Sequence, residues 1–156
     1  MFSLKQRAKD LSSSRLFDQN NFYESFFNDL KRAKKEVIIE SPFITTKRMK
    51  VMLPLLMKLT KHGVRVVINT KPPDEHEFQY RLQAERAISE LQKIGVRVLL
   101  TNGHHRKLAI IDRSIIWEGS LNILSHNDSC EVMRRMSSEL LAKQMLSFLR
   151  LEKFIV

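Results

Sequence analysis

Hydrophobic residues at helical spacing alternate with short β-branched runs along the chain. Phe22, Phe26, Leu30 and Ala33 recur at intervals of four, four and three residues, and this spacing predicts one face of an amphipathic helix that begins near residue 20. The run Val-Ile-Ile at residues 37–39 follows and is ended by Ser and Pro, so it predicts a short buried strand.

Two further units follow, each with the order helix, glycine, strand. They comprise residues 49–59, Gly63 and residues 64–68, and then residues 84–94, Gly95 and residues 96–100. A glycine just past the last apolar position is a common helix stop. Thr45 or Thr46 is expected to cap the first of these helices, and Pro54 inside it predicts a kink or a split into two pieces.

The C-terminal third of the chain has a different pattern. Residues 107–111 and 115–117 are short apolar runs joined by Asp-Arg-Ser, which predicts a hairpin. Residues 131–134 predict one more short strand, and Ser137 or Ser138 is expected to cap a last helix. The hairpin therefore extends the preceding helix–strand units.

This order of elements predicts an α/β fold with a central mixed, mostly parallel sheet flanked by helices on both faces. Residues 1–18 are polar and predict a loose N-terminal arm or a peripheral helix. Residues 19–156 predict a single domain, because a chain of 156 residues fits one hydrophobic core.

Charge is the unusual feature of the composition. The chain has 27 Lys and Arg against 17 Asp and Glu, a formal net charge of +10. Such a surplus favours a polyanionic partner, foremost a nucleic acid and less so an anionic membrane surface. The alternative is a protein that carries excess lysine and binds no polyanion.

The number of cysteines and the hydropathy of the chain bear on the cellular compartment of the protein. Cys130 is the only cysteine, so one chain can form neither an intrachain disulfide nor a Cys-based zinc site, and we expect its thiol to be inert and partly buried. The first residues lack the apolar core of a signal peptide, and no apolar stretch is long enough for a membrane span. We therefore expect a cytoplasmic protein with no membrane partner.

Residues 104–122 contain the side chains suited to phosphate chemistry. His105 and Lys107 are two residues apart, so on a strand they point to the same face. A lysine supplies positive charge to a phosphate, and a histidine can attack phosphorus or move a proton. Gly119 allows close backbone approach, and Ser120 and Asn122 add a hydroxyl and an amide.

These residues match the phospholipase D (PLD) superfamily signature H-x-K-x4-D-x6-G-S-x-N at every fixed position and spacing. The matching positions are His105, Lys107, Asp112, Gly119, Ser120 and Asn122. The chain thus resembles that superfamily, and the helix–strand order upstream agrees with its α/β fold. The segment from residue 119 to 135 further resembles PLD-like domains of bacterial helicase-linked and nuclease proteins.

The resemblance implies a role for each matching residue. His105 would be the nucleophile and form a phosphohistidine, while Lys107 and Asn122 would bind the phosphate oxygens and Ser120 would assist by hydrogen bonding. Asp112 is grouped with the catalytic residues by the signature, although in such proteins it tends to be structural. Glu131 is the candidate for the acid that orients the histidine.

Only one copy of the signature is present. The chemistry needs one neutral imidazole to attack and one protonated imidazole to release the departing alkoxide, so the resemblance implies a homodimer with His105 from each subunit at one phosphate. Neither a metal ion nor another cofactor is required, because lysine, asparagine and imidazolium supply the positive charge and the hydrogen bonds.

Other side chains are candidates for contact with a nucleic acid. Lys47, Arg48 and Lys50 form a basic run near a predicted helix start, and His126 lies between the signature and the predicted strand at 131–134. A solvated helix face is the alternative for the basic run. His104 neighbours the signature without occupying one of its fixed positions.

The function predicted from the sequence is a metal-independent phosphodiesterase, an endonuclease acting on DNA or RNA. One alternative is a nucleic-acid-binding PLD-like module without catalysis, partnered by a helicase or another component of a repair or restriction assembly. The other alternative is a phospholipid phosphodiesterase, which would call for an acyl-binding surface or an anchor. The sequence leaves open DNA against RNA and single against double strand.

Overall fold

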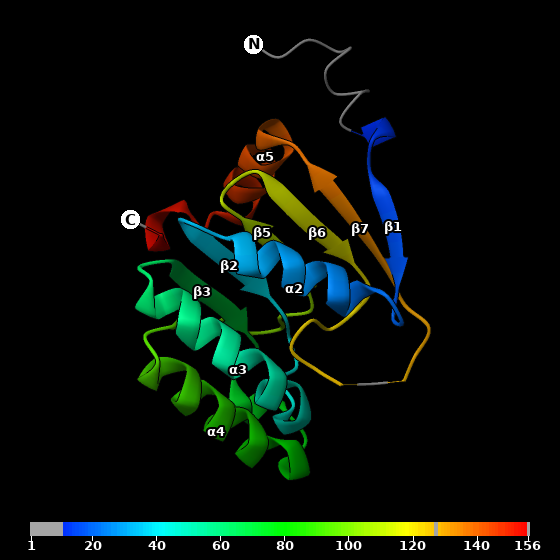
Figure 1. Cartoon of the computed structure of the whole chain (residues 1–156). Helices are drawn as coiled ribbons and strands as arrows, with labels where there is room; N and C mark the ends of the chain where they lie inside the picture. Colours follow the sequence, from blue (N-terminus) through cyan, green and yellow to red (C-terminus); the bar gives the residue numbers. More distant parts are fainter. Residues whose placement is uncertain (1–10, 127, 156) are drawn as a thin grey trace.

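Seven strands form one mixed sheet in the computed structural model, which describes residues 11–126 and 128–155 (Figure 1). Their order across the sheet is β1-β7-β6-β5-β2-β3-β4. The elements are β1 (Arg15–Asp18), α2 (Phe22–Arg32), β2 (Glu36–Glu40), α3 (Thr46–Lys61), β3 (Arg65–Thr70), the 3-10 turn η1 (Pro73–Glu75), α4 (Phe78–Lys93), β4 (Arg97–Leu100), β5 (Leu108–Ile111), β6 (Ile115–Gly119), β7 (Val132–Ser137), α5 (Glu139–Leu149) and the 3-10 turn η2 (Glu152–Phe154).

The α/β class, the mixed sheet and helices on both of its faces are confirmed. The share of parallel pairing is smaller than expected, which corrects the prediction of a mostly parallel sheet. Only β2–β3 and β3–β4 pair in parallel, whereas β5–β2, β5–β6, β6–β7 and β1–β7 are antiparallel. The reason is that the hairpin β5–β6 enters the sheet beside β2 and brings β7 and β1 with it.

The N-terminal boundary also differs from the prediction. Residues 15–18 form β1, which pairs with β7 at the edge of the sheet, so this part of the expected arm belongs to the domain. Phe17 packs on Trp117 with ring centroids 4.9 Å apart, and this contact accounts for the attachment of the strand. Residues 1–10 of the expected arm lie outside the described residues.

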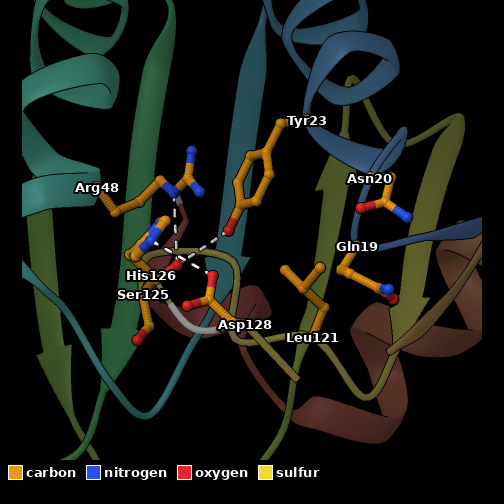
Figure 2. Close-up of a pocket in the computed structure, with 8 residues that line it drawn as sticks. All are labelled: Gln19, Asn20, Tyr23, Arg48, Leu121, Ser125, His126 and Asp128. Atoms are coloured by element: carbon orange, nitrogen blue, oxygen red, sulfur yellow. Dashed lines mark hydrogen bonds and ion pairs between the residues drawn. The ribbon is translucent and has the colours of Figure 1, made fainter. Parts of the chain in front are cut away.

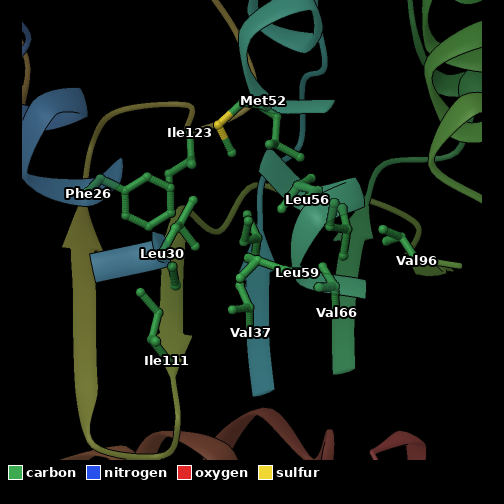
Figure 3. Close-up of a cluster of buried hydrophobic side chains, with 14 of the residues drawn as sticks. Phe26, Leu30, Val37, Met52, Leu56, Leu59, Val66, Val96, Ile111 and Ile123 are labelled. Carbon is green, nitrogen blue, oxygen red and sulfur yellow. The ribbon is translucent and has the colours of Figure 1, made fainter. Parts of the chain in front are cut away.

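Two hydrophobic cores lie on the two faces of the sheet. Helices α2, α3 and α4 cover one face, where Phe26, Leu30, Met52 and Leu56 pack against strand residues such as Val37 (Figure 3). Helix α5 covers the other face. The alternation of side chains along each strand explains this division, since successive residues point to opposite faces.

Side-chain caps fix the start of two helices. Thr45, not Thr46, caps α3, with its Oγ1 accepting from the backbone of Arg48 at 3.4 Å, and Ser138 caps α5. Helix α3 continues past Pro54 without a split. Within the described residues no helix is both long and apolar enough to cross a membrane.

The chain segments that bear the signature meet at one end of the strands. Strands β2, β3 and β4 end there, the antiparallel β5 begins there, and β6 ends there immediately before Ser120. Helices α2 and α3 begin at the same end of the sheet, because each follows a strand that ends there (Figure 1). Polar residues from distant parts of the sequence therefore meet at these strand ends.

Candidate active site

His105 and Lys107 lie in the segment that leads into β5, and their side chains meet. Lys107 Nζ donates to His105 Nδ1 at 3.0 Å and to the backbone oxygen of His105 at 2.8 Å. The His105 residue is exposed and Lys107 is half-buried. An imidazole and an ammonium are thus placed side by side where a phosphate can reach both.

Glu131 and Ser120 complete the charged part of the site. Burial lowers the pKa of Lys107, and the charge of Glu131 offsets part of this effect. Hydrogen bonds from Ser120 and Ser129 lower the pKa of Glu131, and Lys107 lowers it further. Lys107, Glu131 and Ser120 are therefore near neighbours. The described hydrogen bond of His105 goes to Lys107, so orientation of His105 by Glu131 stays a prediction.

Gly119 brings the end of β6 against β7. A Cβ at this position would lie 2.0 Å from the carbonyl oxygen of Val132 and 2.9 Å from the Cα of Met133. Ser120 then donates its backbone N–H to that same oxygen at 2.9 Å, and its Oγ accepts from the Val132 N–H at 3.0 Å. The signature glycine is thus required for close packing, and it fixes the place of Ser120.

Asn122 lies in a loop that is held by buried neighbours and by hydrogen bonds to Tyr23. Leu121 and Ile123 are buried, and the Tyr23 hydroxyl donates to the backbone oxygens of Ile123 at 2.9 Å and Ser125 at 3.1 Å. The Oδ1 of Asn122 is buried and has no hydrogen-bond partner among the described residues. Such an unsatisfied acceptor is able to accept a hydrogen bond from a donor on a bound molecule.

Asp112 lies away from His105 and Lys107. It follows β5 at the opposite end from His105 and occupies the hairpin turn with a φ of 50°. Its carboxylate accepts backbone N–H bonds from Lys34, Lys35 and Glu36 at 2.8 to 2.9 Å. The grouping of Asp112 with the catalytic residues is therefore corrected, and its structural role is the one that the geometry supports.

A pocket of about 470 Å³ opens beside the signature residues. Its apolar rim includes Leu16 and Val132, which are 59% and 50% exposed. The lining residues are Leu16, His105, Arg106, Lys107, Leu108, Glu118, Gly119, Val132 and Arg134.

A second pocket of about 260 Å³ is lined in part by the loop that contains Asn122, through Leu121, Ser125 and His126 (Figure 2). Arg48 lies flat over the ring of Tyr23, with 3.4 Å from the guanidinium carbon to the ring centroid. Burial raises the pKa of Tyr23 to about 12, so its hydroxyl keeps its proton. The lining residues are Gln19, Asn20, Tyr23, Arg48, Leu121, Ser125, His126 and Asp128.

Two of the four candidate nucleic-acid contacts, Arg48 and His126, line this second pocket, and Lys47 contacts one of them. His126 Nε2 lies 2.9 Å from Lys47 Nζ, and Arg48 Nε donates to the backbone oxygen of Ser125 at 3.4 Å. Lys50 is exposed on α3 and does not line the pocket. The basic run is thus divided between the pocket and the solvent.

The sequence reasoning missed Glu40 and Gln19. Glu40 ends the buried strand β2 and is fully buried, and His104 donates to it; a charged residue at the end of an apolar run is the signal that would have found it. Gln19 Oε1 accepts from the Glu131 backbone at 2.9 Å and carries no such signal. Cys130 is exposed, not partly buried as expected.

Clustered metal ligands are absent from the part of the chain that the structure describes. No group of three or more His, Cys, Asp and Glu side chains there is arranged to hold a metal ion.

Similar solved structures share the fold over almost the whole chain. A phospholipase D family member, Nuc, from Salmonella typhimurium is 15% identical, with a TM-score of 0.73, and the match covers 92% of this chain and 95% of that one. NucT from Helicobacter pylori is 20% identical, with a TM-score of 0.72 and coverage of 92% and 96%. A phosphatidylserine synthase from Haemophilus influenzae is 13% identical, with a TM-score of 0.64, and the match covers 89% of this chain but 38% of the synthase.

A search of curated proteins finds no match. The family model for the cardiolipin synthase PLD-like domain matches residues 26–150, which contain every signature residue and most of the sheet. With the signature geometry and the shared fold, this match places the chain in the phospholipase D superfamily as a PLD-like domain.

Proposed function

We propose that this protein is a metal-independent phosphodiesterase that hydrolyses nucleic acid through a phosphohistidine at His105. The observation that carries the proposal is the 3.0 Å contact between Lys107 Nζ and His105 Nδ1. Ser120 follows Gly119, whose backbone N–H donates to the Lys107 oxygen at 3.3 Å, and the charge of Glu131 acts on the lysine. The superfamily supports phosphodiester chemistry in general terms. The net charge of +10 favours nucleic acid as the substrate.

The reaction proceeds in two displacements. A bound phosphate attracts the Lys107 ammonium and so releases the His105 imidazole from it. A neutral His105 attacks phosphorus, the P–N bond forms, and the P–O bond to the leaving oxygen breaks as a second imidazolium gives that oxygen a proton. Water then attacks phosphorus, and the second imidazole takes its proton while the P–N bond breaks. Proton donation of this kind is worth about 10²–10⁴ in rate.

The remaining signature residues stabilise charge on the phosphate. Lys107 supplies an ammonium, and Asn122 and Ser120 supply hydrogen bonds to the non-bridging oxygens. Glu131 accepts from the imidazole that has given up its contact with Lys107. These side chains provide the charge and hydrogen bonds needed without a metal ion, so we expect activity in excess chelator.

The second imidazole comes from His105 of a partner subunit in a homodimer. Leu16 and Val132 are half-exposed apolar residues on the rim of the pocket that His105 also lines, and apolar rims of this kind favour burial by a second chain. If both histidines serve one centre, mixing wild type with His105→Ala and allowing subunit exchange lowers activity as the square of the wild-type fraction. A linear decrease would contradict a shared site.

The second pocket and its basic neighbours form the proposed nucleic-acid surface. Lys47 and Arg48 lie at the start of α3, and His126 lies on the loop that contains Asn122. Lys50 extends this surface along the helix. Replacement of Lys47 and Lys50 by Ala is expected to weaken DNA binding and to reduce its salt dependence, because each lysine that neutralises a phosphate releases counterions.

The direct test is cleavage in EDTA. Single- and double-stranded DNA and RNA are incubated with wild type, with His105→Ala and with the matched control His62→Ala. His62 lies at the end of α3, where its ring contacts a backbone oxygen, so its loss should leave activity unchanged. Cleavage by wild type and by the control, but not by His105→Ala, is the expected result.

Other outcomes decide against the proposal. Strict dependence on an added metal, or full activity of His105→Ala, would rule out the mechanism. Salt-sensitive binding without cleavage would favour the non-catalytic module of a larger repair or restriction assembly, partnered for instance by a helicase. Hydrolysis of phospholipid vesicles without nucleic-acid cleavage would favour lipid chemistry.

A further inference from the structure

Glu40 is a fully buried carboxylate at the last position of β2, where it pairs with Leu108, the first residue of β5. Its relative exposure is 0%. It accepts from Asn69 Nδ2 at 3.2 and 3.3 Å, from Arg106 Nε at 3.4 Å and Nη2 at 3.3 Å, and from His104 Nε2. A buried charge is costly unless it is paired and hydrogen-bonded, and these partners satisfy it.

The two partners from the signature segment flank His105 in the sequence. The side chains of His104 and Arg106 both contact Glu40, whereas those of His105 and Lys107 contact each other. In the strand that follows, successive side chains alternate between faces, with Leu108 and Ile110 in the core under α5 and Ala109 and Ile111 in the core under α2 and α3.

Backbone hydrogen bonds hold the two ends of the segment 104–107, from His104 N–H to the Thr101 oxygen at 3.2 Å and from Gly119 N–H to the Lys107 oxygen at 3.3 Å, and Glu40 holds its middle. The register of β5 against β2 ends at the pair Glu40 and Leu108, so residues 104–107 precede the strand and lie beyond the ladder. The Glu40 side chain occupies the next position and holds this segment from both sides of His105. Asn69, which also bonds Thr101 Oγ1 at 2.9 Å, ties Glu40 to the neighbouring strands.

The ionised state of Glu40 is favoured by the partners that hold it. Burial raises the pKa of Glu40, but the hydrogen bonds and charges of His104 and Arg106 outweigh burial, so the pKa lies below its ordinary value. The Nδ1 of His104 is buried and has no partner among the described residues, so the ring is held through Nε2, which faces Glu40.

We propose that Glu40 is a positioning residue, which fixes His104 and Arg106 and thereby sets the direction of the His105 imidazole and the Lys107 ammonium. This inference rests on the proposed function, in which those two groups act on the phosphate. Glu40 itself is fully buried and does not line the pocket beside His105, so it does not touch the substrate. Its contribution is geometric, and a displacement of reacting groups by about 1 Å can lower a rate by about 10²-fold.

The test compares Glu40→Gln with a matched buried carboxylate. Gln keeps the size of the side chain but removes the charge and turns an amide N–H toward His104 or Arg106. Asp29→Asn is the control, because Asp29 is 5% exposed and is held by Trp117 at 2.8 Å and Arg135 at 2.7 Å, away from the segment 104–107. Each variant is first checked for folding by circular dichroism.

Two measurements separate positioning from stability. The first is kcat and KM at a temperature where all variants are folded. Glu40→Gln is expected to lower kcat about 10- to 100-fold with KM nearly unchanged, since positioning acts on the reacting geometry and not on distant binding contacts. Asp29→Asn is expected to leave kcat per folded molecule unchanged.

The second measurement is the ring ¹⁵N spectrum of His105 at fixed pH without substrate. Glu40→Gln is expected to shift the His105 signals, because the Lys107–His105 contact is altered, whereas Asp29→Asn leaves them in place. Unchanged His105 signals together with an unchanged kcat would overturn the positioning role. This spectrum needs no activity, so the inference is tested even when wild type cleaves nothing, and that last result would count against the proposed function instead.

A second variant covers the case in which Glu40→Gln does not fold. Arg106 has a side chain that is 43% exposed, so Arg106→Gln removes one of the two flanking bonds without leaving a buried gap. Arg106→Lys restores the positive charge with a shorter reach. The expected order of kcat is wild type, then Arg106→Lys, then Arg106→Gln, and equal kcat values in all three would contradict the proposal.

Discussion

Asp112 offers a sharp test, because it belongs to the signature but lies at the far end of β5 from His105. Five residues of extended chain separate Lys107 from Asp112, which corresponds to about 16 Å at about 3.3 Å per residue. Replacement of Asp112 should therefore change stability and leave the chemistry of a folded molecule intact.

The magnitude follows from the three backbone bonds. One oxygen of Asp112 accepts from Lys35 and Glu36 and the other from Lys34. Hydrogen bonds to a charged group contribute about 1.5–3 kcal/mol each, and the two bonds that are exposed to solvent contribute less. Asp112→Asn keeps one acceptor oxygen, so we expect a loss of about 1 kcal/mol.

Asp112→Ala removes all three bonds and places alanine at a φ of 50°. The left-handed backbone adds about 1–2 kcal/mol for a residue other than Gly, Asn or Asp. Together with the lost bonds, the expected decrease is about 3–4 kcal/mol. Urea unfolding measures both variants, and the midpoint should fall while the slope m stays constant.

The acid limb of the stability curve provides an independent check. Burial raises the pKa of Asp112, but bonds from Glu36, Lys34 and Lys35 outweigh it and hold the pKa below its ordinary value of 3.8. The stability that depends on the ionised carboxylate is thus present above pH 3.8 and is lost as the pH falls through the folded-state pKa. The difference between wild type and Asp112→Asn should shrink over that interval. Loss of turnover in folded Asp112→Asn, with unchanged stability, would refute this reasoning.

Three further predictions concern the packing and the charge of the site. Gly119→Ala should lower the free energy of unfolding by about 3 kcal/mol or more, since its Cβ would lie 2.0 Å from a backbone oxygen. At Gly63 a Cβ would meet nothing within 4 Å, but φ is 80°, so Gly63→Ala should lower that free energy by about 1–2 kcal/mol. Equal losses in urea unfolding would contradict the steric account. Asp29→Ala should cost about 3–5 kcal/mol, because it leaves the Arg135 guanidinium and the Trp117 N–H without their buried acceptor; a shift of the thermal midpoint no larger than that of a surface variant would argue against it. Burial lowers the pKa of Lys107 below 10.5, so DNA binding by a His105→Ala protein should weaken as the pH rises through that lowered value, and a Lys107→Arg version should keep its affinity there. The same decline in both proteins would exclude Lys107 as its cause.

Much of the fold could be predicted from local patterns. The helical spacing of Phe22, Phe26 and Leu30 and the β-branched run of β2 were sufficient, because burial on one face leaves a periodic trace in the sequence. The balance of parallel and antiparallel pairing could not be predicted in this way. It depends on where the hairpin β5–β6 enters the sheet, and β1 depends on the contact of Phe17 with Trp117, which is 100 residues away.

The candidate site was predictable only where spacing is fixed. His105, Lys107 and Ser120 follow from the signature, and the structure brings Lys107 next to both His105 and Glu131. The contacts that hold these residues in place could not be predicted from the sequence. Glu40 and Gln19 come from other parts of the chain and reach the site only through the topology of the sheet. Spacing also gave no reason to separate Asp112 from the catalytic residues.

The most direct test of the central claim is capture of the covalent intermediate. Wild type is mixed with a short DNA or RNA substrate in EDTA and quenched in alkaline denaturant within the first turnover, and the digested protein is analysed by mass spectrometry. A nucleotidyl phosphate on the peptide that contains His105, absent from His105→Ala, is the predicted result. Turnover with an adduct on a different residue, or undiminished turnover by His105→Ala, would contradict the mechanism.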